Sequence, residues 1–108
     1  MANQTYMPPA LGTVLKIGVT ANIGNDMHLS DVDFTCTFFN KNGSSSQNFQ
    51  KSEMTYLDDD NYMAVVDTTK MGTGKYYARL TVMVPDDNVI GGIREEVVSF
   101  PTNIYVVN

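Results

Sequence analysis

The sequence predicts an all-β protein, an antiparallel β-sandwich of about seven to nine strands. Apolar residues recur at every second position in several stretches, turn-forming residues separate these stretches, and no window has a sustained helical period. A chain of 108 residues is long enough for one domain with its own core. We therefore expect a sandwich over residues 13–108, preceded by an extended N-terminal arm over residues 1–12.

The arm is predicted from Pro8 and Pro9, which have no backbone N–H to donate and hold the chain extended. An extended arm can reach a neighbouring subunit. The residues that we expect to make this contact are Tyr6, Met7, Pro8, Pro9 and Leu11.

The first strand is predicted over residues 13–20, where Leu15, Ile17 and Val19 alternate with other residues. The clearest strand lies in LSDVDFTCTFFN, residues 29–40, where one face collects Val32, Phe34, Cys36 and Phe38. Asn42-Gly43 then favours a tight hairpin turn. Weaker strands are expected at about 48–57 and 62–67, separated by the polar turn of residues 58–61.

The next strand is predicted from residue 75 to Pro85, which ends it because proline cannot donate to a ladder. Every second residue of this strand is apolar, so one face collects Tyr76, Ala78, Leu80, Val82 and Val84. Residues 93–107 then indicate one strand, or a broken pair of strands hinged at Pro101.

Three residues around the start of the strand predicted from residue 75 favour an immunoglobulin-like form of the sandwich: Gly72, Gly74 and Tyr76. In that fold a tyrosine stands at the corner entering strand F, two residues before the second cysteine, and its hydroxyl bonds back to upstream backbone. Here Tyr76 has this spacing, with Ala78 in place of the cysteine. An ordinary glycine turn before a strand is the alternative. In the immunoglobulin-like arrangement we expect Cys36 on strand B.

The composition excludes several classes of function. The net charge is −5, from 7 Lys and Arg against 12 Asp and Glu, so the protein repels nucleic acid and anionic lipid. A single cysteine allows neither an intrachain disulfide nor a multi-cysteine zinc site. The first residues resemble no secretory signal and no segment is apolar enough to span a membrane, so we expect a protein that folds in the cytoplasm.

No catalytic, cofactor or metal constellation is predicted, and we expect no enzyme. His28 is the lone histidine, and Cys36 falls on the apolar face of its strand, where a thiolate is disfavoured. Residues 44–46 are serines of a polar turn. The residues 58–61 and 86–88 could offer oxygen ligands to Ca²⁺ but lack the EF-hand spacing. Glu95 and Glu96 fall on opposite faces of a strand, so they cannot act on one bond.

Taken together, LSDVDFTCTFFNKNG at 29–43, TTKMGTGKYYARLTV at 68–82 and TNIYVV at 102–107 indicate a family. Over residues 13–107 the chain resembles the immunoglobulin-like N-terminal domain of phage baseplate upper proteins, and related short virion proteins of Bacteroides and crAss-like phages. Baseplate upper proteins continue into a large C-terminal part, whereas this sequence ends after its last strand. This sequence is therefore as compatible with a capsid-decorating or head-fibre component as with a tail or baseplate component.

The resemblance implies a non-enzymatic virion structural protein, assembled in the host bacterial cytoplasm. Its implied partners are other virion subunits, and it would be present in many copies or as a homo-oligomer. The alternative is a carbohydrate-binding or host-surface adhesion module that uses Tyr56, Tyr62 or the loop 44–47. Glycan modules commonly expose aromatic platforms, and this chain has no tryptophan.

Overall fold

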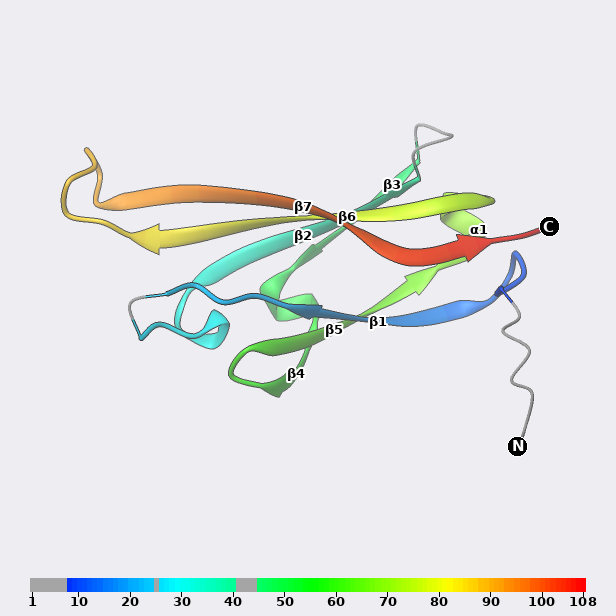
Figure 1. The fold of residues 1–108 in the computed structure, drawn as a ribbon, viewed down its shortest axis with the longest axis horizontal. Helices are drawn as coiled ribbons and strands as arrows, with labels where there is room; N and C mark the ends of the chain where they lie inside the picture. Colours follow the sequence, from blue (N-terminus) through cyan, green and yellow to red (C-terminus); the bar gives the residue numbers. More distant parts are fainter. Residues whose placement is uncertain (1–7, 25, 41–44) are drawn as a thin grey trace.

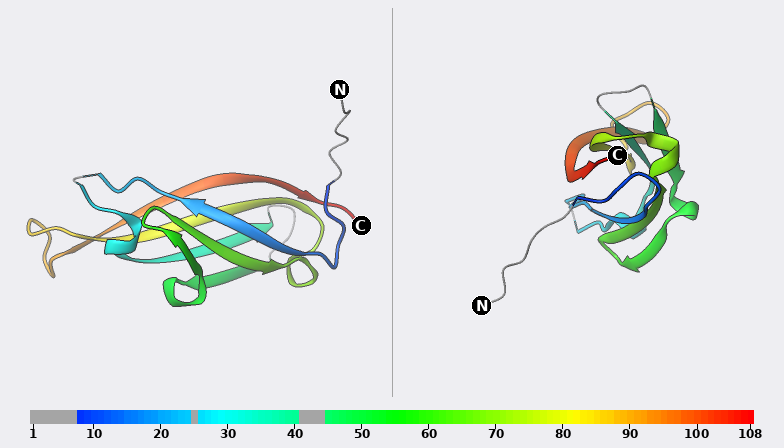
Figure 2. Two further views of the ribbon diagram at one scale, coloured as in Figure 1. Left: turned by 90° about the horizontal axis from the view of Figure 1, so that it is seen from below. Right: turned by 90° about the vertical axis from the view of Figure 1, so that its right-hand side faces the viewer.

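The computed structural model describes residues 8–24, 26–40 and 45–108, and these form two facing antiparallel sheets (Figures 1 and 2). The three-stranded sheet has the order β1 (Val14–Thr20), β5 (Asn61–Asp67) and β4 (Thr55–Asp58). The four-stranded sheet has the order β3 (Ser46–Gln50), β2 (Asp33–Asn40), β6 (Gly74–Pro85) and β7 (Ile93–Val106). Short helical turns connect them: η1 (Leu29–Asp31), η2 (Lys51–Glu53) and α1 (Thr68–Met71). The predicted all-β, two-layer architecture is confirmed.

The core lies between the two sheets and follows the predicted alternation. Every second residue of β6 is buried, from Tyr76 to Val84, and β2 buries Phe34, Cys36 and Phe38. Ile17 and Val19 of β1 and Ala64 and Val66 of β5 close the core from the other sheet. A β-strand projects successive side chains to opposite faces, so a period of two is what a half-buried strand requires.

The predicted single strand at 48–57 is wrong, because η2 interrupts it and sends its two halves to different sheets. Lys51 in η2 anchors the crossing: its ammonium group donates to the carbonyls of Ser30 and Val32 at 2.8 and 2.7 Å. Met54 is buried directly after the turn. The chain therefore crosses from the edge of one sheet to the edge of the other within a few residues.

Cys36 does not lie on the predicted strand B. In the immunoglobulin fold, strands B and F belong to opposite sheets, whereas β2 is hydrogen-bonded directly to β6, with Cys36 opposite Leu80 in the register. Neighbouring strands of one sheet cannot supply the two ends of an inter-sheet disulfide. The thiol is instead one more apolar group of the core.

The last strand, β7, runs without interruption through Pro101, so of the two predicted alternatives the structure has the single strand, with an irregularity. The register with β6 shifts between Lys75 and Tyr77, which pair with Tyr105 and Pro101. Asn103 lies in the shifted stretch with a φ of 62°. Together β6 and β7 form a long hairpin that extends beyond the rest of the sandwich at one end (Figures 1 and 2).

Part of the predicted arm is docked on the chain itself. Ala10 forms a parallel bridge with Val107 after β7. The Leu11 N–H donates to the Val107 carbonyl at 2.7 Å, and the Val107 N–H donates to the Pro9 carbonyl at 2.9 Å. Residues 9–11 thus belong to the sandwich, because their backbone groups satisfy the end of an edge strand.

Candidate functional site

The corner around Tyr76 is built from buried polar contacts. The Tyr76 side chain is fully buried, and its hydroxyl donates to the Gly72 carbonyl at 2.5 Å. Gly72 has a φ of 84°, which a residue with a side chain rarely adopts. Asn40 on β2 donates from Nδ2 to the Met71 carbonyl at 3.1 Å and to the Thr73 carbonyl at 2.5 Å. Since these contacts satisfy backbone groups of the turn, the corner has a structural role.

Thr68 ties this corner to the N-terminal segment. Its buried hydroxyl donates to the Thr13 carbonyl at 2.7 Å and accepts from the Gly12 N–H at 2.9 Å. The N-terminal segment is therefore held at two points, by Thr68 and by the end of β7.

Of the residues predicted to bind a partner, Pro8 and Leu11 are exposed and Pro9 is half-buried. Tyr6 and Met7 lie outside the described residues. Leu11 leaves 41% of its surface exposed although its backbone is paired. The side chain of Leu11 thus remains available at the docked end of the segment.

The most extensive unpaired backbone in the described part of the chain is the outer edge of β7. This strand has 14 residues and lies at the edge of its sheet. The bridge of Ala10 with Val107 pairs only the residue that follows its C-terminal end. Ile93, Val97 and Val98 are each more than half exposed along it. An edge strand of this kind offers free N–H and C=O groups to a second strand. Sequence reasoning did not single it out, although the consecutive Val97-Val98 is a signal that neither face of this strand is fully covered.

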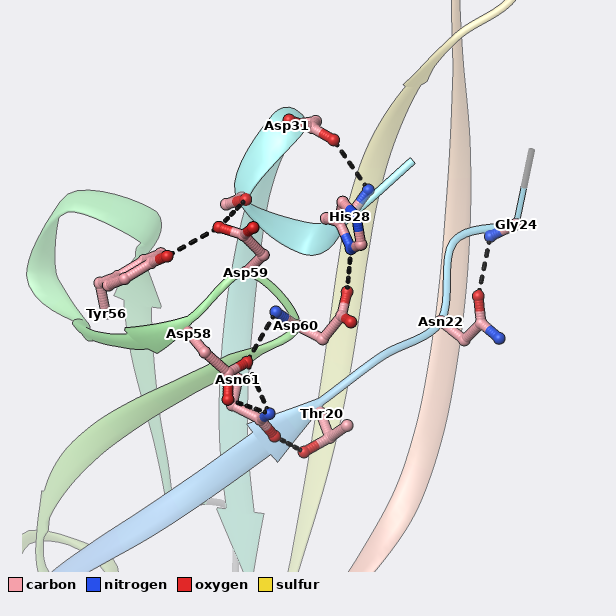
Figure 3. A network of polar contacts seen from close by, with 11 residues as sticks. Thr20, Asn22, Gly24, His28, Asp31, Tyr56, Asp58, Asp59, Asp60 and Asn61 are labelled. Atoms are coloured by element: carbon pink, nitrogen blue, oxygen red, sulfur yellow. Dashed lines mark hydrogen bonds and ion pairs between the residues drawn. The ribbon is translucent and has the colours of Figure 1, made fainter. Parts of the chain in front are cut away.

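A second cluster surrounds His28 where η1 meets the turn between β4 and β5 (Figure 3). The His28 ring Nδ1 lies 3.0 Å from Asp60 Oδ1, and the His28 backbone N–H donates to Asp31 at 2.9 Å. Tyr56 and Ser30 donate their hydroxyl groups to Asp59 Oδ1 at 2.7 and 3.1 Å. The cluster thus joins segments about 30 residues apart in the sequence.

The charges of this cluster are stabilised by their partners. The hydrogen bond to Asp60, followed by the charge of Asp60, raises the pKa of His28 above 6.5. Hydrogen bonds from Tyr56 and Ser30 lower the pKa of Asp59, and the side-chain amide of Asn61 lowers that of Asp58. Asp58, Asp59 and Asp60 therefore each have a hydrogen-bond partner within this cluster.

A Ca²⁺ site at residues 58–61 and 86–88 gains no support from this geometry. In the stretches that the structure describes, no three His, Cys, Asp or Glu side chains gather as metal ligands would. In the other acidic turn, Asp86 accepts from Arg94 Nε at 3.0 Å and from the Asn88 N–H. Arg94 also pairs with Glu96.

Cys36 and His28 occupy different environments. Cys36 is fully buried, and burial raises the pKa of its thiol to about 12. His28 is exposed at the surface beside Asp60. A nucleophile needs a depressed pKa or an adjacent base, and the Cys36 thiol has the opposite environment.

The two tyrosines named for glycan binding also differ in their exposure to solvent. Tyr62 is only 5% exposed and packs edge-on against Phe34 in the core, whereas Tyr56 is 55% exposed. Beside Tyr56 lies an open concavity of about 600 Å³, lined in part by Gln50, Lys51 and Ser52. From the loop 44–47, Ser44 lies outside the described residues, and the Gln47 side chain accepts from the Asp67 N–H at 3.3 Å.

Comparisons with known proteins identify no relative: no family model, no curated protein and no solved structure matches this chain. Over its described residues, the structure contains no helix long and apolar enough to cross a membrane.

Proposed function

We propose that this protein is a non-enzymatic structural protein that binds neighbouring subunits through the outer edge of β7 and the N-terminal segment. The observation on which this rests is the length and exposure of that edge: 14 residues, with Ile93, Val97 and Val98 more than half exposed. Strand addition to such an edge provides main-chain hydrogen bonds for affinity and side-chain contacts for specificity.

We also infer an immunoglobulin-like topology. The order β1, β5, β4 matches strands B, E and D of that fold, and β3, β2, β6, β7 matches C′, C, F and G. The hydrogen bond from Tyr76 to the Gly72 carbonyl supports the tyrosine corner. In this assignment Cys36 lies on strand C, and residues 9–11 stand beside strand G.

The resemblance of residues 29–43, 68–82 and 102–107 to virion proteins suggests where such a subunit acts: in a phage particle, on the capsid surface or in the tail or baseplate. Its partners would be other virion proteins, and it would assemble in the bacterial cytoplasm. A long exposed edge strand and an N-terminal segment with the exposed side chain of Leu11 suit a subunit held by several neighbours.

Incorporation into particles tests this proposal. We expect Val98→Lys to fold normally and to reduce incorporation, because a lysine at the edge disfavours strand addition. Val65→Lys is the matched control, since Val65 is also an exposed valine, 45% exposed on the central strand β5. Equal incorporation of both variants would contradict a role for the β7 edge.

Two deletions separate the parts of the N-terminal segment. Deletion of residues 1–7 keeps the bridge of Ala10 with Val107, whereas deletion of residues 1–11 removes it. If the arm binds a neighbour, the protein without residues 1–11 folds and is lost from particles. Loss after deletion of residues 1–7 alone assigns the contact to the part before the bridge, and incorporation after that deletion assigns it to residues 8–11. Normal incorporation after the longer deletion would exclude the arm.

A carbohydrate-binding or adhesion module is the second candidate, favoured by the concavity beside the exposed ring of Tyr56. Aromatic platforms that contact sugars must be exposed, and Tyr56 meets this condition while Tyr62 does not. Binding on a glycan array that is lost in Tyr56→Ala would establish this candidate. An array without binding would exclude it for the glycans presented.

A further inference from the structure

The outer face of the four-stranded sheet points away from the core, and no described helix or strand covers it. The register of β2, β6 and β7 arranges its side chains in rows across the strands. From one end to the other the rows are Phe39, Tyr77 and Pro101; Thr37, Arg79 and Ser99; Thr35, Thr81 and Val97; Asp33, Met83 and Glu95; and Pro85 with Ile93.

One end of this face is aromatic and basic. The rings of Phe39 and Tyr77 stack at 5.8 Å with an interplanar angle of 21°. The Arg79 guanidinium lies 5.4 Å from the Phe39 ring centroid, and Lys75 Nζ lies 5.7 Å from that of Tyr77. Two of the 7 basic residues of an acidic protein thus gather on one end of one sheet face.

The other end of the face is acidic and apolar. Asp33 and Glu95 flank Met83 in one row, and all three lie on the face opposite the buried Phe34 and Val82. Pro85 and Ile93 form the next row, with Ile93 54% exposed. Each end of the face thus has an apolar row outermost and a charged row further in, basic at one end and acidic at the other.

We propose that a second copy of this chain docks on this face, with its strands antiparallel to those of the first and a two-fold axis along the Thr81 row. Such a rotation places each strand over its own copy and reverses the order of the rows. Arg79 then faces Met83 of the second copy between its Asp33 and Glu95, Tyr77 faces Pro85, and Pro101 faces Ile93. Thr81 faces its own copy.

Charge selects this orientation over the parallel one. A two-fold axis along the strands would place the acidic row over the acidic row of the other copy, and Arg79 beside Arg79. Like charges brought together at an interface are unfavourable, whereas opposite charges fix the register of two partners. The antiparallel arrangement is the one in which both charged rows find opposite charge.

The size of the face sets the expected affinity. Strands lie about 4.8 Å apart and alternate residues about 6.8 Å apart, so five rows on three strands cover roughly 500 Å² on each copy. The total of about 1,000 Å² is at the lower bound for a specific interface. We therefore expect a dimer whose population depends on concentration.

Sedimentation velocity of the purified chain, from micromolar to submillimolar concentration, tests the proposal without any particle. Its result is therefore independent of the proposed binding through the β7 edge. We expect Arg79→Glu to weaken the dimer about tenfold or more, because it places three acidic groups together. Lys16→Glu is the matched control, since Lys16 is exposed on β1 of the other sheet. The triple variant R79E, D33K and E95K restores opposite charges and should restore the dimer.

Crosslinking gives a second readout that does not depend on reversing a charge. Facing sheets lie about 10 Å apart, so a short bismaleimide should join two Thr81→Cys chains and should not join two Lys16→Cys chains. The buried Cys36 does not compete for the reagent. A monomer at every concentration, equal dimers of R79E and K16E, or no crosslink through Thr81→Cys would each overturn the proposal.

Discussion

Removal of one oxygen atom at the corner of β6 should measurably weaken the whole sandwich. In Tyr76→Phe the ring stays in the core, and only the hydrogen bond to the Gly72 carbonyl, at 2.5 Å, is lost. A hydrogen bond of this kind contributes about 1 kcal/mol net, and an acceptor left without its donor adds to the loss. Because Gly72 is half-buried, water reaches its carbonyl in part. We expect the free energy of unfolding to fall by about 1–2 kcal/mol.

Thermal and urea denaturation followed by circular dichroism measure this change. For a domain of this size, a loss of 1 kcal/mol lowers Tm by about 4–8 °C. Tyr105→Phe is the control, since Tyr105 lies on β7 with 55% of its surface exposed and its change should stay within about 0.5 kcal/mol. A Tyr76→Phe protein as stable as the Tyr105→Phe protein would refute the structural role of the corner.

Three further predictions concern other parts of the molecule. Thr68→Val removes the two hydrogen bonds of the buried Thr68 side chain, to Thr13 and from Gly12. It should lower the free energy of unfolding by about 1–3 kcal/mol and speed amide exchange at Gly12; an unchanged exchange rate would contradict its role as a tether. The pKa of His28 is raised in the folded chain by Asp60, so its contribution to stability is present below the unfolded value of 6.5 and is lost as the pH rises through the folded pKa; NMR titration should show this raised pKa and its return toward 6.5 in Asp60→Asn. Cys36, with a pKa of about 12, should react with a thiol reagent only after unfolding, and rapid labelling of the native chain would contradict its burial.

The strands with strong local signals are those that the sequence predicted well. The alternation from Tyr76 to Val84 has the same phase in the structure, because each of those side chains fills the space between two sheets. The β2 strand follows its predicted phase for the same reason. Local periodicity suffices where one face of a strand is fully buried.

The contacts that the sequence could not predict are long-range ones. The break at Lys51–Glu53 has no glycine or proline to mark it, and depends on Lys51 reaching carbonyls about 20 residues away. Cys36 was expected on a strand of the sheet opposite β6, but β2 pairs with β6 in the same sheet. This pairing depends on how the sheet assembles and cannot be predicted from the sequence of either strand alone. The docking of residues 9–11 joins the two ends of the chain, and the pair of His28 with Asp60 spans 32 residues.

The candidate surfaces show the same limit. Pro8, Pro9 and Leu11 could be proposed from local stiffness and apolar character alone. The unpaired edge of β7 and the charge order of the outer sheet face require the strand order and register, since Arg79 and Glu95 become members of one surface only after β6 and β7 pair.

Quantitative mass spectrometry of purified phage particles, from the cells that carry this gene, tests the proposed role most directly. The protein should copurify with the particles in a constant ratio to the major capsid protein, and the Val98→Lys protein should be depleted from them. A protein that stays in the soluble lysate and is absent from intact particles would contradict a structural role in the virion.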